Sequence, residues 1–191
     1  MNYPNGIKHK ETKNIHYDNR GMSLENDLNV TNQYYVSNNI AFIYKKPTPI
    51  QITKVDFSNR HNVVIKEAFF KEPSTTDYNG LYKGMYIDYE AKETNSKTSF
   101  PLANIHKHQI KHLNDIYCNG GLAFLIVRFN KVNKTFLLKA EDFLNFIKKN
   151  ERKSIPLSFF EKKAFQVEEK YNIRLDYLKI VDNLLEVQNV K

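Results

Sequence analysis

The sequence predicts an α/β protein in which helices flank a mixed sheet. Alternating or continuous apolar residues, which are typical of strands, recur between residues 40 and 129. Segments with helical spacing lie before, between and after these strands, an order that a helix-flanked mixed sheet requires. Apolar residues make up 41% and charged residues 26% of the 191-residue chain, which suits a globular protein with a real core.

The first 20 residues are expected to form a flexible basic tail, because they hold too few apolar side chains to order alone. Residues 21–191 are expected to form a single domain, since the chain is of ordinary one-domain length. The first helix is predicted at residues 23–37, where Ser23 can cap the amino end and leucines recur at helical spacing.

A strand is predicted at residues 40–46, and two prolines that lack hydrogen-bond donors end it. Residues 50–57 alternate, residues 58–62 are a polar turn, and residues 63–70 are extended again. These two strands predict a hairpin that projects from the body as a stalk around residues 54–72.

The remaining elements follow from the same patterns. Residues 72–84 are rich in turn formers, and a strand is predicted at 85–93. Helical spacing at 102–118 ends at Asn119-Gly120-Gly121, and the very apolar run 121–129 predicts a central strand buried on both faces. A short strand and a helix are expected within 134–150, and one or two helices within 158–185.

The net charge of +8 and the pI near 9.3 indicate an acidic partner, either nucleic acid or an anionic membrane surface, and charge alone does not choose between them. The amino terminus has no apolar stretch that could act as a signal peptide, and no run is long enough to span a membrane. A single cysteine, Cys118, cannot form an intramolecular disulfide. We therefore expect a cytoplasmic protein without a membrane partner.

The strand predicted at 85–93 carries charged residues on one face, because Asp88, Glu90 and Lys92 alternate along it. A solvated strand edge also has this pattern, and spacing alone favours that explanation. Asp77 adds an acid in a turn-rich segment that can return to the end of the strand. Two carboxylates can then hold a hard cation such as Mg²⁺, while the lysine orients water and offsets phosphate charge. This D…ExK arrangement is typical of metal-dependent phosphodiester hydrolysis.

Longer motifs carry a family resemblance. NRGMSLE (19–25), KKPTPIQI (45–52), PSTTDYNGLYKGMYIDYEAKETNSKTSFPL (73–102) and HKHQIKHL (106–113) together resemble the RecU family of Holliday junction resolvases from low-GC Gram-positive bacteria and their phages. The resemblance implies a restriction-endonuclease-like fold of the PD-(D/E)xK class and a homodimer. It also implies Mg²⁺-dependent nicking of paired strands at four-way DNA junctions in recombination and repair, with Mn²⁺ as a substitute ion.

The same resemblance assigns roles to residues. The catalytic residues that it implies are Asp77, Glu90, Lys92 and Gln109, of which Asp77 and Glu90 bind the metal. Supporting roles fall on Glu25 of the GMSLE motif, on Thr75 and on Asp88. Asp88 is placed in the supporting group because the metal set of the family uses Asp77 instead.

DNA contacts are expected from the tail, the body and the hairpin. In RecU-like proteins a stalk enters the centre of the junction, and Arg60 matches a stalk arginine implicated in contacts with the junction and with the recombinase RecA. RecA and the branch-migration machinery are therefore candidate partners. The residues expected to contact DNA are Arg20, Lys45, Lys46, Arg60, Lys66, Phe69 and Lys83, with Lys8, Lys10 and Lys13 of the tail. Phe69 and Met85 depart from the family, which more often has tyrosine and a basic residue there.

Three histidines lie close together in the segment 106–113 and could be mistaken for zinc ligands. His106, His108 and His112 have no accompanying HExxH motif, so we expect them on the surface or facing DNA rather than on zinc.

Two alternative functions stay open: a protein that binds junctions without cutting, or a related nuclease acting on other branched DNA, would share the same fold. Intact Asp77, Glu90 and Lys92 argue against the non-cutting alternative.

Overall fold

The computed structural model describes residues 23–57, 63–71, 75–171 and 173–189. Its centre is a six-stranded sheet. In spatial order the strands are β1 (Phe42–Lys45), β4 (Tyr78–Tyr82), β5 (Met85–Thr94), β7 (Leu122–Phe129), β8 (Lys134–Lys139) and β10 (Phe165–Gln166). The β5–β7 pair is parallel, whereas the other neighbours pair antiparallel. The predicted mixed sheet is therefore confirmed.

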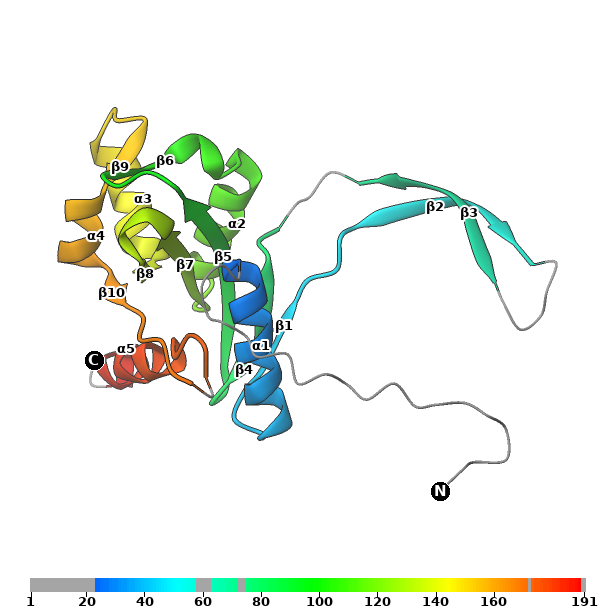
Figure 1. Ribbon diagram of the computed structural model, residues 1–191, viewed down its shortest axis with the longest axis horizontal. Coiled ribbons are helices and arrows are strands. Elements are labelled where there is room, and N and C mark those ends of the chain that lie inside the picture. The colour runs from blue at the N-terminus through cyan, green and yellow to red at the C-terminus, as the bar shows by residue number, and fades with distance from the viewer. Residues whose placement is uncertain (1–22, 58–62, 72–74, 172, 190–191) are drawn as a thin grey trace, which may run out of the picture.

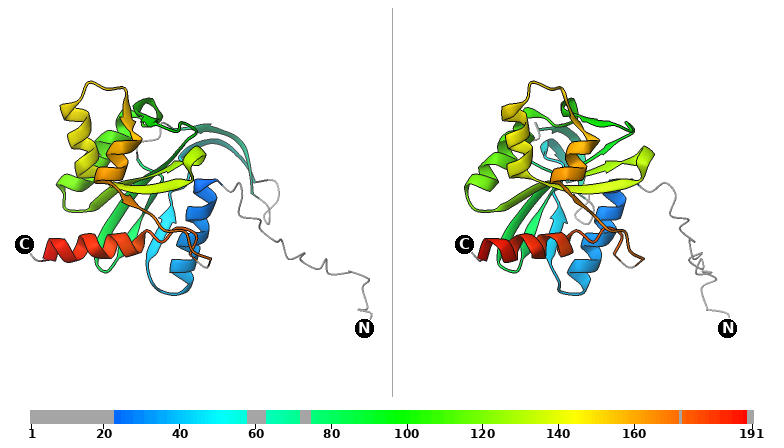
Figure 2. Two further views of the ribbon diagram at one scale, coloured as in Figure 1. Left: turned by 60° about the vertical axis from the view of Figure 1, so that its left-hand side comes forward. Right: turned by 90° about the vertical axis from the view of Figure 1, so that its left-hand side faces the viewer.

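Helices cover both faces of this sheet (Figures 1 and 2). Side chains of α1 (Leu24–Ser37) and α5 (Leu178–Asn189) share one core cluster, and side chains of α2 (Lys107–Cys118), α3 (Ala140–Lys149) and α4 (Leu157–Lys163) share the other. The central strand β7 is buried along its whole length and alternates between the two cores. Its Phe124 and Ile126 belong to the first cluster, whereas Leu125 and Val127 belong to the second.

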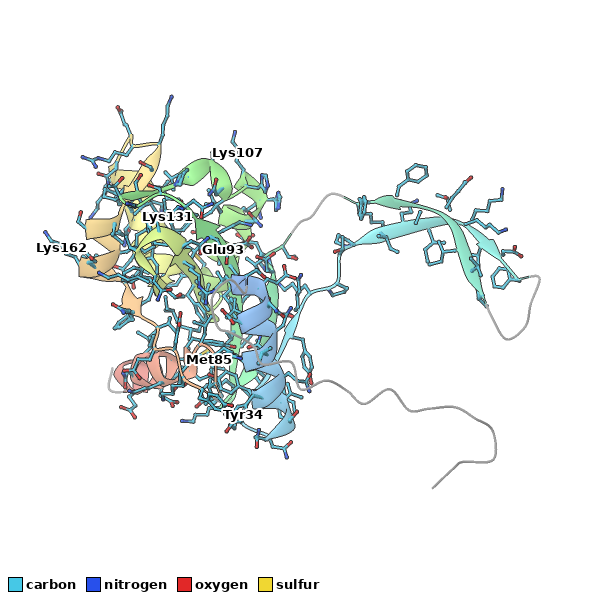
Figure 3. All side chains as sticks on the ribbon, in the orientation of Figure 1. Tyr34, Met85, Glu93, Lys107, Lys131 and Lys162 are labelled. Carbon is cyan, nitrogen blue, oxygen red and sulfur yellow. The ribbon has the colours of Figure 1, made fainter. Side chains whose placement is uncertain are left out.

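The predicted hairpin is present and stands apart from the body (Figure 1). Strands β2 (Ile50–Asp56) and β3 (Val64–Phe70) pair antiparallel, from Ile50 opposite Phe70 to Asp56 opposite Val64. Every residue of β3 is exposed, and side chains project from both faces of the hairpin (Figure 3). The predicted basic tail and the hairpin turn at 58–62 lie outside the described residues.

The smaller elements refine the boundaries predicted from the sequence. The helix expected at 102–118 is divided into a 3-10 turn, Leu102–Asn104, and α2, which begins after the cap residue His106. Strands β6 (Ser99–Pro101) and β9 (Ser154–Pro156) form a separate pair that the sequence patterns did not predict, and a second 3-10 turn spans Asn130–Val132. Of the one or two helices expected within 158–185, two occur, as α4 and α5. No helix in the described part of the chain has the length and apolar character to cross a bilayer.

Strand β4 lies inside a segment that the sequence led us to expect as turn. The misleading residue is Gly80, which is not in a turn but faces the neighbouring strand β1. A Cβ at this position would lie 2.1 Å from the carbonyl oxygen of Phe42 and 2.5 Å from the Cα of Ile43. Gly80 therefore permits the close approach of β1, as glycine does where backbones approach closely.

The actual turn of this segment joins β4 to β5 through Lys83 and Gly84. Both residues have positive φ angles, 48° and 79°, as a two-residue hairpin turn requires. This turn sets the register in which Tyr78 lies opposite Tyr89. The two rings stack with centroids 4.8 Å apart inside the first core cluster.

Replacing Gly80 with alanine is expected to destabilise the sheet. The new methyl group would force β1 away from β4, and overpacking of this kind costs about 1–3 kcal/mol. For a chain of this size, each kcal/mol lowers the melting temperature by about 2–4 °C. Thermal unfolding monitored by circular dichroism measures the effect.

Gly84→Asn is the matched control, because a Cβ added at Gly84 would meet no atom of the described residues within 4 Å and asparagine tolerates a positive φ angle. A Gly80→Ala protein that melts with the wild type would show that β1 does not need this close approach.

Candidate active site

The candidate site lies where β5 extends beyond β4. The β4 ladder stops at Tyr89, whereas β7 accompanies β5 as far as Thr94. Continuing the β4–β5 register by one residue places Asp77 opposite Glu90 on the same face. The Asp77 carboxylate accepts a hydrogen bond of 3.1 Å from the Ala91 amide, which holds it against the unpaired edge of β5. The structure thus brings together the two acids predicted to bind metal.

Glu90 is a fully buried carboxylate with two different oxygens. Its Oε1 accepts hydrogen bonds from Lys92 Nζ and from Gln109 Nε2, each at 2.6 Å. Its Oε2 is buried and has no hydrogen-bond partner among the described residues. A buried oxygen without a partner is costly, so this atom is well suited to bind a cation.

Gln109 reaches Glu90 in a fixed orientation. Its Oε1 accepts a hydrogen bond of 2.9 Å from the amide of His106, at the beginning of α2. The amide nitrogen must then face Glu90, since the oxygen is already engaged. The first turn of α2 therefore positions one of the four predicted catalytic side chains.

Burial raises the pKa of Glu90 to about 8, and the charge of Asp77 acts in the same direction. The Lys92 ammonium lowers the pKa but does not overcome these effects. Two carboxylates that share a site resist simultaneous ionisation, and a bound cation removes that resistance. A cation bound beside Asp77 and Glu90 would therefore favour the ionised form of Glu90.

A cavity of about 290 Å³ opens beside Asp77 and Lys92. The N-terminus of α1 forms one side, and the Leu24 amide donates a hydrogen bond to the Glu93 carboxylate. Glu25 lies on the rim and forms an ion pair with Lys45. The residues that line the cavity are Ser23, Leu24, Glu25, Asp77, Tyr78, Ala91, Lys92 and Glu93.

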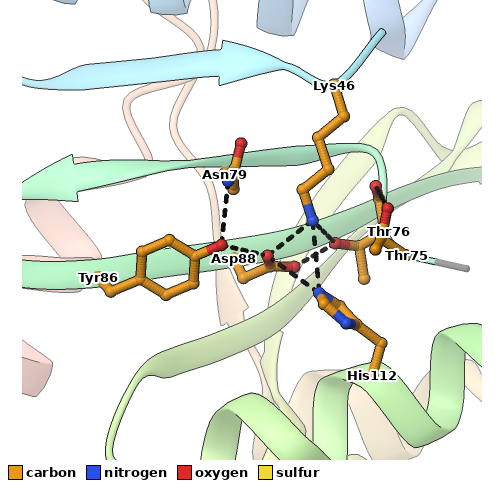
Figure 4. Close-up of polar contacts among 7 residues, drawn as sticks. All are labelled: Lys46, Thr75, Thr76, Asn79, Tyr86, Asp88 and His112. Carbon is orange, nitrogen blue, oxygen red and sulfur yellow. Dashed lines mark hydrogen bonds and ion pairs between the residues drawn. The ribbon is translucent and has the colours of Figure 1, made fainter. Parts of the chain in front are cut away.

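Asp88 lies beside Glu90 and is also fully buried, but its oxygens are occupied by protein groups (Figure 4). Oδ1 accepts a hydrogen bond from the Thr76 hydroxyl, and Oδ2 lies 2.7 Å from Lys46 Nζ. Tyr86 donates to Oδ2 at 3.0 Å, and His112 Nε2 lies 3.2 Å from it. His112 therefore points inward to a carboxylate, so a position on the open surface is wrong for this residue, while the alternative that it faces DNA stays a prediction.

The other predicted site residues are distributed more widely. Thr75 is half-buried, and its hydroxyl donates to the carbonyl of Thr76 at 3.4 Å. Lys66 and Phe69 are exposed on the hairpin, where Lys66 pairs with Asp56 at 3.0 Å. Lys83 pairs with Asp182 of α5 at 2.6 Å.

Two predicted DNA contacts, Arg20 and Arg60, lie outside the described residues together with Lys8, Lys10 and Lys13. The contact of Arg60 with RecA stays a prediction. Lys46 is mostly buried, with 17% of its side chain exposed, and its charge is directed at Asp88.

The donor set fits a small hard cation. Asp77 and Glu90 supply carboxylate oxygens, and Glu90 Oε2 has no competing partner among the described residues. The described residues contain no cluster of three or more His, Cys, Asp or Glu side chains placed to hold an ion. Mg²⁺ does not need such a cluster, because it usually binds one or two carboxylates and keeps several waters.

Sequence reasoning missed Thr76, Tyr86 and Glu93 as parts of this region and did not predict the inward positions of Lys46 and His112. The i, i+2 rule could have placed Tyr86 on the face of Asp88. Lys46 could not be found in this way, because its contact with Asp88 joins segments 42 residues apart. Only the fold brings them together.

The chain has close relatives of known name. The family model for Recombination protein U, RecU, matches residues 19–183. A protein of Pediococcus pentosaceus named Holliday junction resolvase RecU is 50% identical, covering 97% of this chain and 98% of the relative. Proteins of the same name from Bacillus cytotoxicus and Geobacillus kaustophilus are 47% and 46% identical and cover 95% and 96% of this chain, and 96% and 97% of their own lengths.

A solved structure of Hjc, a Holliday junction resolvase from Archaeoglobus fulgidus, aligns with 74% of this chain and 92% of its own. The TM-score is 0.43 and the identity is 10%, so this weak likeness adds nothing to the assignment. The assignment rests on the family model and the relatives of high identity. Since these extend over nearly the whole sequence, the chain belongs to the RecU family.

Proposed function

We propose that this protein is a Mg²⁺-dependent Holliday junction resolvase that nicks paired strands of four-way DNA junctions in the cytoplasm during recombination and repair. Family membership supports the substrate, since relatives of nearly full coverage carry that name. The observation that carries the chemistry is the buried Glu90 Oε2, which has no hydrogen-bond partner in the described part of the chain and shares a strand face with Lys92.

In this proposal Asp77 and Glu90 hold the cation, which when bound supplies positive charge to the scissile phosphate and promotes ionisation of water. Lys92 orients the attacking water and offsets the charge that develops on the phosphate. Lys92 is suited to this task because its side chain is only 24% exposed and its ammonium is already directed at Glu90.

Gln109 holds the Glu90 carboxylate through Oε1, so Oε2, which has no hydrogen-bond partner among the described residues, would be the oxygen that binds the cation. Glu25 and Glu93 line the same cavity as Asp77 and Lys92 and would add negative charge beside a bound cation. Recognition of the junction would depend on shape and phosphate contacts, so binding should weaken steeply as salt increases.

The protein is expected to act as a homodimer, because resolution needs two symmetric cuts and one copy has one site. One cross-strand row of the sheet, Phe42, Leu81 and Tyr86, is exposed, and Tyr44 beside it is exposed as well. Exposed apolar groups that adjoin in this way are typical of association surfaces. We propose that a second copy covers this row.

Glu90→Gln should lose Mg²⁺-dependent nicking of a labelled mobile four-way junction by about 100-fold or more, because the amide cannot neutralise a cation. Binding of the junction without metal should persist, since the fold and the basic surface are unchanged. Glu161→Gln, which changes a surface pair with Lys134, should cut like the wild type.

The same nicking assay, run on the four-way junction and on linear duplex, distinguishes the alternative functions. Preferential cutting of linear duplex would favour a related nuclease of other specificity. A wild type that binds the junction but does not cut it with any divalent ion would be a junction-binding protein.

Metal binding should strengthen with pH. Glu90 has its pKa raised from 4.5 to about 8, so in metal-free protein its contribution to stability is present below pH 4.5 and is lost as pH rises through 8. Each pH unit below that pKa should weaken the apparent affinity for Mg²⁺ about tenfold, because the proton competes with the ion.

Melting curves with and without Mg²⁺, in the absence of DNA, measure this linkage. The rise in melting temperature should be larger at pH 9 than at pH 6, and Glu90→Gln should abolish it. A Mg²⁺ effect that does not change with pH would contradict the role of Glu90.

The Phe42→Ser/Leu81→Ser double variant should dissociate the homodimer in sedimentation velocity experiments. If the dimer buries both side chains, losing them at about 1.5–3 kcal/mol each would weaken association by about 100-fold or more. Tyr171→Ser, at a position that is 90% exposed, is the control and should not change the association. An unchanged dimer in the double variant would place the interface elsewhere.

A further inference from the structure

The direction of the β2–β3 hairpin is not set by burial of its own strands. Every residue of β3 is exposed, and β2 has five exposed and two half-buried residues. The side chains of the hairpin stand clear of the body (Figure 3). Among the described residues, the interactions that can orient it therefore lie at its two ends, where the chain leaves and re-enters the sheet.

These ends lie close together beside the active site. The outgoing end leaves β1 at Lys46, whose amide donates to the carbonyl of Asp77 at 2.8 Å. The returning end reaches the sheet at Thr76, next to Asp77 in the chain. The Lys46 ammonium donates to the Thr76 hydroxyl at 2.9 Å, so the two ends are in direct contact.

Asp88 binds both ends at once (Figure 4). Its Oδ2 pairs with Lys46 at 2.7 Å and its Oδ1 accepts from Thr76, while the carboxylate itself is 0% exposed. Tyr86 and His112 hold the carboxylate from the remaining sides, at 3.0 and 3.2 Å. Lys46 also lies 3.4 Å from His112 Nε2, which connects this end of the hairpin to α2.

We propose that Asp88 is a positioning residue that joins the two ends of the hairpin and fixes the direction in which it projects relative to Asp77 and Glu90. This proposal rests on the proposed function, since a fixed direction matters only if hairpin and site act on one DNA. Asp88 belongs to central strand β5 and is buried, so it offers a rigid base. Loops that end on such a base are held more precisely than loops held by exposed contacts.

A fixed hairpin direction matters because it sets the distance between the bound junction and the active site. A junction engaged by the hairpin presents its phosphates to the site only if the hairpin points in a constant direction. Misplacement of a bound substrate by about 1 Å can cost about 100-fold in rate. Because Lys46 and Thr76 both flank Asp77, a loose hairpin would also loosen a metal ligand.

The direct test measures the distribution of distances between body and hairpin. The chain has one cysteine, Cys118, which is exposed at the end of α2, and Lys54 is exposed on β2. Spin labels on Cys118 and on Lys54→Cys, measured by double electron–electron resonance, report the hairpin direction. Dilution with unlabelled protein removes distances between copies, and neither DNA nor metal is added.

Asp88→Asn should broaden this distribution, because the amide loses the charge that attracts Lys46. Cleavage of the junction should fall about 10- to 100-fold in the same variant, as expected for lost positioning. Asp27→Asn is the matched control. It breaks a largely buried pair with Arg128, at 2.7 Å, between α1 and β7, and should leave both the distribution and cleavage unchanged.

An Asp88→Asn protein that is folded and has the wild-type distribution would overturn the proposal. If that variant does not fold, Thr76→Val is measured instead. It releases the returning end alone and should also broaden the distribution, so an unchanged distribution would again overturn the proposal. A wild type that does not cut junctions refutes the proposed function, while the distances still decide whether Asp88 fixes the hairpin.

Discussion

The constraint on which this structure depends is the burial of two adjacent carboxylates, Asp88 and Glu90, on one face of a central strand. Removing a carboxylate from water is costly unless partners surround it, so the neighbouring elements are arranged around these two groups. The start of α2 supplies Gln109 and its next turn supplies His112, while the end of β1 supplies Lys46. The placement of α2 and of the hairpin base can thus be explained by the need to surround these two buried carboxylates with partners.

The two carboxylates differ in how many of their oxygens have hydrogen-bond partners, and this difference supports the roles proposed for them. Both oxygens of Asp88 are satisfied by protein groups, as expected of a structural anchor. Glu90 has one satisfied oxygen and one without a partner in the described residues, which is the arrangement that the proposed metal-binding role requires. In the proposed mechanism, neighbouring acids on one strand face therefore have different tasks, since Asp88 holds the fold and Glu90 binds the cation.

Several features of the fold and of the candidate site were predictable from the sequence, because they depend on local patterns of residues. The period-2 spacing placed Glu90 and Lys92 on one face, and alternation on either side of a polar turn predicted the hairpin. Strand β4 was missed because Gly80 looks like a turn residue, whereas its actual purpose is the close approach of β1. The partners of Asp88 were missed for a different reason. Side-chain contacts between segments separated by 24 and 42 residues leave no periodic signal in one sequence.

The position of the hairpin, inserted between two neighbouring strands of the sheet, has an evolutionary consequence. Its ends meet at Lys46 and Thr76, between two adjacent antiparallel strands, where a short loop would otherwise suffice. An arm inserted there can lengthen, shorten or change sequence without altering the sheet, because loop closure costs little once the ends are already joined. The sheet and the arm are therefore free to diverge at different rates, so the arm can be replaced as a unit while the core that supports it stays unchanged.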